Sequence, residues 1–156
     1  MFKQKNTNAF TLIEIILVIT LFAIVLTVAV PYGLRFFNVE RLNGMSRELL
    51  ESLRLAQSQS TGQNMDSSFG ICIEEESFVL FKGGSYLGRD IPYDQIYYLS
   101  EQINVSGLSE VIFEKLTGLP NQSGEIILTS GGRENIIYIN NQGLISLNLN
   151  VSIAAP

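Results

Sequence analysis

Few side chains in this sequence are suited to catalysis or metal binding. The 156 residues contain no histidine, the commonest general base and metal ligand, and one cysteine, Cys72. A single cysteine excludes an intramolecular disulfide and a thiolate metal cage. Cys72 lies between Ile71 and Ile73, which favours a small hydrophobic side chain in a buried strand over a reactive thiol. The composition therefore predicts a protein that is not an enzyme and has no cofactor.

Two other groups of residues allow a binding role. Glu74, Glu75 and Glu76 suggest calcium or acid–base chemistry, but three adjacent carboxylates on a strand or hairpin point in different directions. We therefore predict a solvated turn. Five tyrosines either form an exposed binding surface or pack and hydrogen-bond at domain edges: Tyr86, Tyr93, Tyr97, Tyr98 and Tyr138.

The most unusual carboxylate is Glu14, the only charged residue in the apolar run from Phe10 to Val30. A helix of that length measures roughly 31 Å, which matches the hydrocarbon core of a bilayer. The run therefore predicts a transmembrane helix. A carboxylate one turn into such a helix costs about 2 to 3 kcal/mol. We expect Glu14 either to stay hydrated near the interface or to have a partner.

The residues from Ala9 to Glu14 resemble the processing site of type IV pilin-like proteins. The resemblance rests on residue identities, on a short leader carrying Lys3 and Lys5, and on the apolar helix that follows. It implies that a prepilin peptidase cuts between Ala9 and Phe10 on the cytoplasmic side, and that the new Phe10 amine is N-methylated. Relatives usually have glycine before the cut, so Ala9 is a departure, although a small one.

Cleavage gives Glu14 a candidate partner. The new Phe10 ammonium can meet the Glu14 carboxylate of a neighbouring subunit, and pairing in low dielectric penalises subunits in the wrong axial register. Pro31 is the second predicted assembly residue. It removes a backbone donor just before Tyr32 and Gly33, so the helix should kink or melt there. The resemblance implies that this stretch loses helicity on assembly; the alternative is a helix simply leaving the membrane.

The charge distribution predicts orientation and disfavours one class of partner. Lys3 and Lys5 should remain cytoplasmic, which leaves the rest of the chain on the far side. We expect a single-pass protein of the inner (cytoplasmic) membrane with an extracytoplasmic C-terminal domain, which later enters a pilus or pseudopilus filament. From Phe10 onward the net charge is −7. An acidic surface makes binding to nucleic acid unfavourable.

A second apolar pattern follows the predicted membrane span. Residues with helical spacing predict an amphipathic continuation over 31–62, with one face packed on a domain: Leu42, Met45, Leu49, Leu53 and Ala56. Ion pairs of Glu51 with Arg54 and Arg47 would account for charges on the wet face.

From residue 63 to 156 the periodicity shortens to that of strands. Apolar stretches separated by turn residues predict strands at 69–73, 78–81, 96–99, 111–113, 126–128, 136–139 and 144–153. The expected fold class is α+β. A long N-terminal helix, membrane-spanning over 10–30 and amphipathic over 31–62, packs on an antiparallel β-sandwich-like domain of residues 63–156. Residues 1–9 form the leader peptide.

The stretch from Val111 to Ile145 also resembles the C-terminal pattern of GspH/FimT-type minor pseudopilins. It has an apolar triplet at 111–113, then Gly118, two further strands and Gly143. Leu144 follows Gly143, where that family often has arginine.

Together the two resemblances imply a minor pilin or pseudopilin of a type IV pilus or a type II secretion machine. The implied partners are other pilin subunits, the prepilin peptidase/methyltransferase and an inner-membrane assembly platform. One alternative is a DNA-binding minor pilin for natural transformation, which needs a basic patch. From Gln57 onward, however, the chain has 4 basic and 11 acidic residues. The other is a single-span membrane enzyme, which the lack of histidine and of a nucleophile motif disfavours.

Overall fold

The computed structural model describes residues 11–62 and 66–152. The chain divides into two units, Met1–Phe37 and Asn38–Pro156. One helix, α1 (Leu12–Thr61), contributes to both units.

The helix α1 is continuous over its 50 residues. Pro31 and Gly33 are both helical, so the helix does not melt at Pro31 in this structure, whereas the loss of helicity expected on filament assembly stays a prediction. A proline inside a helix removes one backbone hydrogen bond at a cost of roughly 3 kcal/mol, and the turns on either side keep theirs. The end of the helix was predicted correctly. The Gly62 amide donates to the Ser58 carbonyl at 3.0 Å and closes the last turn.

Among the described residues, strands form two four-stranded antiparallel sheets. The first has the order β3-β2-β1-β5 and consists of β1 (Phe69–Ile73), β2 (Ser77–Lys82), β3 (Gln95–Tyr98) and β5 (Glu110–Phe113). The second has the order β4-β6-β7-β8 and consists of β4 (Asn104–Gly107), β6 (Gly124–Ser130), β7 (Arg133–Ile139) and β8 (Ile145–Ser152). A short 3-10 helix, η1 (Ile91–Tyr93), lies between β2 and β3.

Each of the seven predicted strand segments coincides with a strand, but β4 was missed. Its four residues include one large apolar side chain, Val105, so it has no hydrophobic pattern. Backbone pairing with β6 forms this strand instead, from Asn104 opposite Thr129 to Gly107 opposite Ile126. Gly107 has φ +95°, and a Cβ there would collide with the Glu125 carbonyl.

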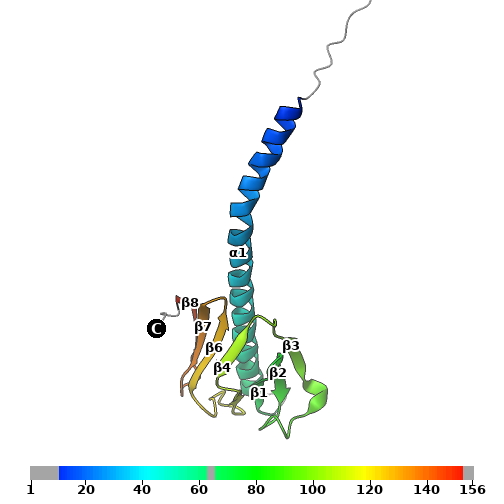
Figure 1. Ribbon diagram of the computed structural model, residues 1–156. Coiled ribbons are helices and arrows are strands. Elements are labelled where there is room, and N and C mark those ends of the chain that lie inside the picture. The colour runs from blue at the N-terminus through cyan, green and yellow to red at the C-terminus, as the bar shows by residue number, and fades with distance from the viewer. Residues whose placement is uncertain (1–10, 63–65, 153–156) are drawn as a thin grey trace, which may run out of the picture. The chain divides into compact units, whose positions relative to one another are not determined.

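The second half of α1 packs against both sheets, as the amphipathic pattern predicted. Leu42, Leu49 and Leu53 are fully buried. They share one core with Phe78 of the first sheet and Ile126 of the second. Figure 1 shows both sheets alongside this part of the helix.

The ion pairs predicted on the wet face of α1 do not form. Among the described residues the ion pairs join Arg89 to Asp94 and Lys115 to Asp66. Arg54 instead donates to the carbonyl of Ile145 at 3.4 Å. Exposed ion pairs at helical spacing contribute only a few tenths of a kcal/mol, so a backbone acceptor within reach can replace them.

Two polar side chains fix the position of α1 on the second sheet. Asn135 is fully buried at the irregularity in β7, and its amide donates to Asn43 Oδ1 and Ser46 Oγ, each at 3.0 Å. From the helix, Gln57 Nε2 donates to the carbonyls of Gly118 and Gly143 at 3.0 and 2.8 Å. A donor that is removed from water and has no acceptor destabilises the fold. These hydrogen bonds therefore favour one register of the helix on the sheets.

Candidate functional site

The first turn of α1 is capped by a residue whose role the sequence analysis missed. The Glu14 amide donates to Thr11 Oγ1 at 3.3 Å and lies 3.1 Å from the Thr11 carbonyl, which also accepts from Ile15. Thr11 and Glu14 have the spacing of a capping box, and a carboxylate in the first turn interacts favourably with the helix dipole. Glu14 therefore has a local structural role in addition to any role between subunits.

The first unit presents an apolar surface on every side of the helix. Every described side chain from Thr11 to Thr27 is exposed. Leu12 is 76% exposed, Leu17 63% and Phe22 63%, although these residues, five positions apart, point in different directions around the axis. A helix that is apolar all round is normally covered by lipid or by other protein. This surface therefore needs a cover that the described part of the unit does not supply.

The polar side chains of this segment fit apolar surroundings, with one exception. Thr20 and Thr27 donate their hydroxyls to the carbonyls one turn earlier, Ile16 and Ala23, each at 2.7 Å. Such bonds remove the desolvation cost of a hydroxyl. The carboxylate of Glu14 makes no hydrogen bond or ion pair with another described residue. Glu14 is thus the polar group between residues 12 and 27 that still needs a partner in an apolar environment.

The predicted site residues are not gathered into one place. Ala9 and Phe10 lie outside the described residues. Glu14 is in the first turn of α1, and Pro31 lies 17 residues further along, about 25 Å at the rise of a helix. The cleavage and assembly roles of these residues remain predictions.

The predicted membrane span begins at Phe10, outside the described residues. Within residues 11–62 and 66–152, no helix combines the length and the apolar character needed to cross a membrane.

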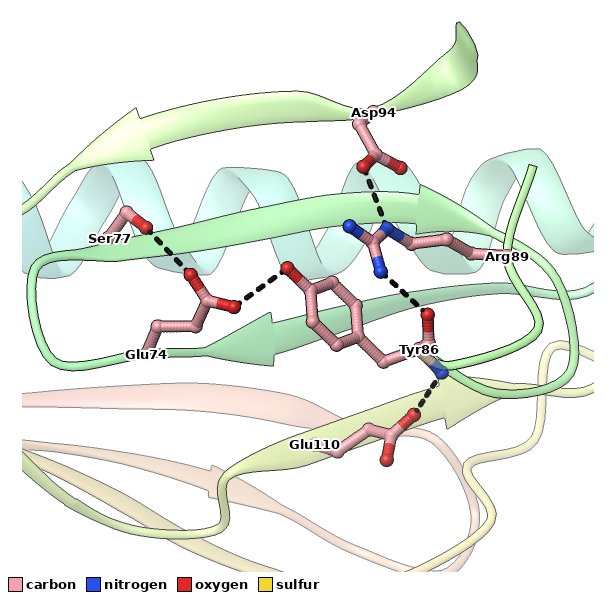
Figure 2. Close-up of polar contacts among 6 residues, drawn as sticks. All are labelled: Glu74, Ser77, Tyr86, Arg89, Asp94 and Glu110. Atoms are coloured by element: carbon pink, nitrogen blue, oxygen red, sulfur yellow. Dashed lines mark hydrogen bonds and ion pairs between the residues drawn. The ribbon is translucent and has the colours of Figure 1, made fainter. Parts of the chain in front are cut away.

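A polar cluster on the outer face of the first sheet, which we call the clasp, consists of Glu74, Tyr86, Arg89, Asp94 and Glu110 (Figure 2). The Tyr86 hydroxyl donates to Glu74 Oε1 and the Tyr86 amide to Glu110 Oε1, each at 2.8 Å. Arg89 donates to Asp94 Oδ2 at 2.7 Å and to the Tyr86 carbonyl at 2.8 Å, and its guanidinium lies 3.7 Å from the Tyr86 ring centroid. The clasp ties the β2–β3 connection to β1 and β5.

The clasp has structural rather than reactive chemistry. Burial, and then the hydrogen bond to Glu74, raise the pKa of Tyr86 to about 12, so its hydroxyl is a neutral donor at ordinary pH. The hydrogen bond to Asp94 raises the pKa of Arg89, which stays charged. Beneath the connection, the ring of Phe81 meets the edge of Tyr86 at a centroid distance of 5.5 Å. These contacts cover apolar residues on the outer face of the sheet.

Cys72 and the acidic turn do not form a reactive or metal-binding site. Cys72 is half-buried, and burial, followed by Glu110 and Glu74, raises the pKa of its thiol, so the nucleophilic thiolate is disfavoured. Glu75 and Glu76 are exposed between β1 and β2, which confirms the predicted solvated turn. Within the described part of the chain, no three histidine, cysteine, aspartate or glutamate residues are placed to hold a metal ion.

Two of the five tyrosines pack or hydrogen-bond within the second unit, and the other three are at least partly exposed. Tyr97 stacks on Phe78 at a centroid distance of 4.8 Å and joins the core, and Tyr86 belongs to the clasp. Tyr98 is 76% exposed, and Tyr93 and Tyr138 are partly exposed. The exposed tyrosines are therefore divided between the two sheets.

A comparison with protein families finds a match at the N-terminus. Residues 4–30 match the family model described as the prokaryotic N-terminal methylation motif. The chain carries a prepilin-type methylation motif. This motif supports a type IV pilin-like protein, and it implies processing by a prepilin peptidase and assembly with other pilins. The matched residues include the predicted cleavage site, Glu14 and the exposed apolar part of α1. No curated protein and no solved structure is found to match this chain.

Proposed function

We propose that this chain is a minor pilin or pseudopilin of a type IV pilus or a type II secretion machine. It is an inner-membrane precursor that is cut between Ala9 and Phe10, methylated at Phe10, and then joins or initiates a helical filament. The observation that carries the proposal is the unpartnered Glu14 carboxylate in an exposed, apolar helix, at a matched methylation motif. The first half of α1 anchors the precursor in the membrane and later packs among the helices of other subunits.

The chemistry of Glu14 supports this function. A buried carboxylate without a partner is strongly destabilising, whereas a carboxylate that meets an ammonium in the same low-dielectric surroundings is compensated. Cleavage before Phe10 creates an ammonium four residues from Glu14. Methylation keeps its charge, so the ammonium of one subunit can pair with Glu14 of the next and fix their axial register.

The second unit supports assignment to the GspH/FimT type. The two glycines of that resemblance, Gly118 and Gly143, have φ +64° and +79° and both accept hydrogen bonds from Gln57. A Cβ at either position would collide with a neighbouring side chain, from Thr61 at Gly118 and from Gln57 at Gly143. The spacing of these glycines therefore has a structural reason, because both turns dock on the end of α1.

We also propose that the second unit is neither an enzyme nor a DNA receptor. The raised pKa of the Cys72 thiol favours its neutral, less nucleophilic form. Among the cations of the second unit, Arg89 and Lys115 are in ion pairs and Lys82 lies over the ring of Tyr93 at 4.2 Å. A phosphate backbone needs several accessible cations on one surface, whereas three of the four basic residues from Gln57 onward are engaged with other groups, and this part of the chain has 11 acidic residues.

The test is the mass of the mature N-terminus, measured on the protein from filaments sheared off cells that contain the prepilin peptidase. We expect a chain that begins with N-methylated Phe10. Ala9→Gly should be cut at least as well, whereas Ala9→Leu should accumulate uncut because a large residue replaces a small one. Filaments that contain intact Met1, or a chain cut near Ala29, would contradict the proposal.

A further inference from the structure

The edge strand β3 has an unused row of backbone hydrogen-bonding groups. Leu99 donates to the Glu76 carbonyl at 2.8 Å, so Leu99 faces β2. Backbone groups alternate in an antiparallel ladder, and Ile96 and Tyr98 therefore direct their N–H and C=O groups away from β2. Nothing in the described residues pairs with that side of β3. Two donors and two acceptors are thus available to a further strand.

The opposite edge of the same sheet is closed, so β3 is the open edge of this sheet among the described residues. Asn121 donates its amide to the Ile112 carbonyl at 2.8 Å and accepts from the Ile112 amide at 2.9 Å through Oδ1. Pro120 forms a bridge with Phe113. Proteins usually protect an edge in this way, or with lysine, proline, a bulge or a very short strand, and of these β3 has only its short length of four residues.

The side chains beside the open groups are apolar. Ile96 is 53% exposed and Tyr98 76%, and both lie on the face of β3 opposite to Tyr97, whose ring packs in the core. Aromatic and β-branched residues are the side chains that gain most from cross-strand pairing. An added strand would therefore gain apolar contact as well as backbone hydrogen bonds.

The charge at the end of β3 defines the chemistry of the incoming segment. A hollow of about 630 Å³ lies there, lined by Tyr98 and Leu99 and by the carboxylates of Glu75, Glu76 and Glu101. None of these three carboxylates is in an ion pair with a described residue. Ile103 and Val105 give the hollow an apolar part. This combination suits a lysine or arginine, whose aliphatic stem contacts apolar surface while its charge meets carboxylates.

A second copy of this chain does not fit the edge through its own β3. If two β3 strands pair in the antiparallel direction, a two-fold axis between the strands relates the two chains. Figure 2 shows that the strands of this sheet run along α1, so the two helices would point in opposite directions. Neighbouring subunits of a helical filament are related by a screw rotation and not by a two-fold axis, so they cannot pair in this way. The occupant must be a different extended segment.

We propose that β3 accepts an extended segment of a neighbouring filament subunit, which adds a strand to the first sheet. Its alternate residues are apolar and lie opposite Ile96 and Tyr98, and a following lysine or arginine enters the acidic hollow. The identity of the partner as a filament subunit rests on the proposed function, whereas the chemistry of the edge does not. Main-chain bonds supply affinity in such a complex, and the side-chain positions supply specificity.

The test uses the full chain in detergent micelles and a fluorescent ten-residue peptide in which threonine and valine alternate and two lysines follow. Its twin ends in two glutamates. We expect the anisotropy of the lysine peptide to report binding that weakens with salt, with the glutamate twin at least tenfold weaker. The double change of Glu76→Gln and Glu101→Gln should remove most of that difference.

Ile96→Pro tests the backbone contact, because it removes an N–H that the ladder with β2 does not use. We expect at least a tenfold loss of peptide binding at an unchanged melting temperature. Leu144→Ala, which changes an exposed leucine of the second unit, is the matched control and should bind normally. If Ile96→Pro lowers the melting temperature, Ile96→Lys repeats the test, since it places a charge at the edge without changing the backbone.

Three results would overturn the proposal: no binding of the lysine peptide, equal binding of both peptides, or full binding by folded Ile96→Pro and Ile96→Lys. Sedimentation of the full chain as a dimer that Ile96→Pro abolishes would assign the edge to a second copy instead. None of these results changes the mature N-terminus, so failure here is distinguishable from failure of the proposed function.

Discussion

The two halves of α1 are both rich in apolar residues, but among the described residues the exposure of these side chains differs between the halves. In the second half, Leu49 and Leu53 are fully buried against the sheets, and charged residues such as Arg47 face water. In the first half, Leu12 and Phe22 are both more than half exposed. One helix therefore combines a segment whose apolar side chains belong to the core of the second unit with a segment whose described apolar side chains are exposed.

The polar groups follow the same division. Ser46 and Ser60 are buried in the second half and hydrogen-bond to carbonyls of α1 at 2.8 and 2.9 Å, and Ser60 Oγ also accepts from the Phe69 amide. Thr20 and Thr27 are satisfied within the first half, but the Glu14 carboxylate is not. In the second half Gln59 Oε1 is buried without a hydrogen bond, but it is neutral, whereas the group without a described partner in the first half is a carboxylate among apolar side chains.

The largest difference between the halves should appear in stability. Leu53→Ala removes a fully buried side chain from the shared core and should lower the free energy of unfolding by about 2 to 5 kcal/mol. Leu26→Ala, at a leucine that is 56% exposed, should leave it unchanged. Guanidinium unfolding in detergent micelles measures the free energy of unfolding of both variants. An equal decrease in the two variants would contradict the difference between the halves.

The next effect concerns the polar contact that fixes α1 on the second sheet. Asn135→Ala leaves Asn43 and Ser46 without its amide and should cost about 1 to 3 kcal/mol. Asn141→Ala is the matched control, because Asn141 is exposed in a turn. The same unfolding measurement applies. A loss below a few tenths of a kcal/mol at Asn135 would show that apolar packing alone positions the helix.

The sequence predicted the regular parts of this structure because their patterns are local. The helical spacing of Leu42, Leu49 and Leu53 identified the buried face of α1, and β8 was predicted from its alternation. The strand β4 could not be found this way, since its pairing with β6 depends on a distant segment. The clasp was missed for the same reason, because Glu74, Tyr86 and Glu110 come from three separate segments.

The candidate site shows the same limit. Glu14 was recognisable as a charge inside an apolar run, whereas the hydrogen bond from its amide to the capping Thr11 required attention to a residue three positions earlier. The helix is continuous at Pro31, so it does not melt there in this structure, and the loss of helicity on filament assembly stays a prediction.

A smaller effect concerns the clasp, whose contribution to stability should depend on pH at high pH. The folded-state pKa of Tyr86, about 12, lies above the ordinary value of 10.0, so its contribution to stability is complete below pH 10 and is lost as pH rises toward 12. Tyr86→Phe lacks this contribution. The difference in melting temperature between wild type and Tyr86→Phe should therefore shrink across that interval. A constant difference would show that the hydroxyl is not the source.

The smallest effect should come from the helix cap. Thr11→Val removes the hydroxyl that accepts from the Glu14 amide and should cost about 1 kcal/mol at the start of α1. Amide hydrogen exchange in micelles should become faster at Glu14 and Ile15 and stay unchanged beyond Leu42. Thr11→Ser keeps the acceptor and should behave as wild type; unaltered exchange in Thr11→Val would show that the cap is unimportant.

The central claim is that the Glu14 carboxylate pairs with the Phe10 ammonium of another subunit. The most direct measurement is the amount of each variant recovered in sheared filaments relative to membranes. Glu14→Leu should insert and be cut normally, yet its ratio should fall at least about tenfold. The neighbour's ammonium is then left unpaired at a cost on the order of a few kcal/mol, and about 1.4 kcal/mol is a factor of ten. Glu14→Gln should be intermediate, and Thr20→Leu, which removes a hydroxyl already satisfied within the helix, should match wild type. Equal ratios for Glu14→Leu and wild type would contradict the account.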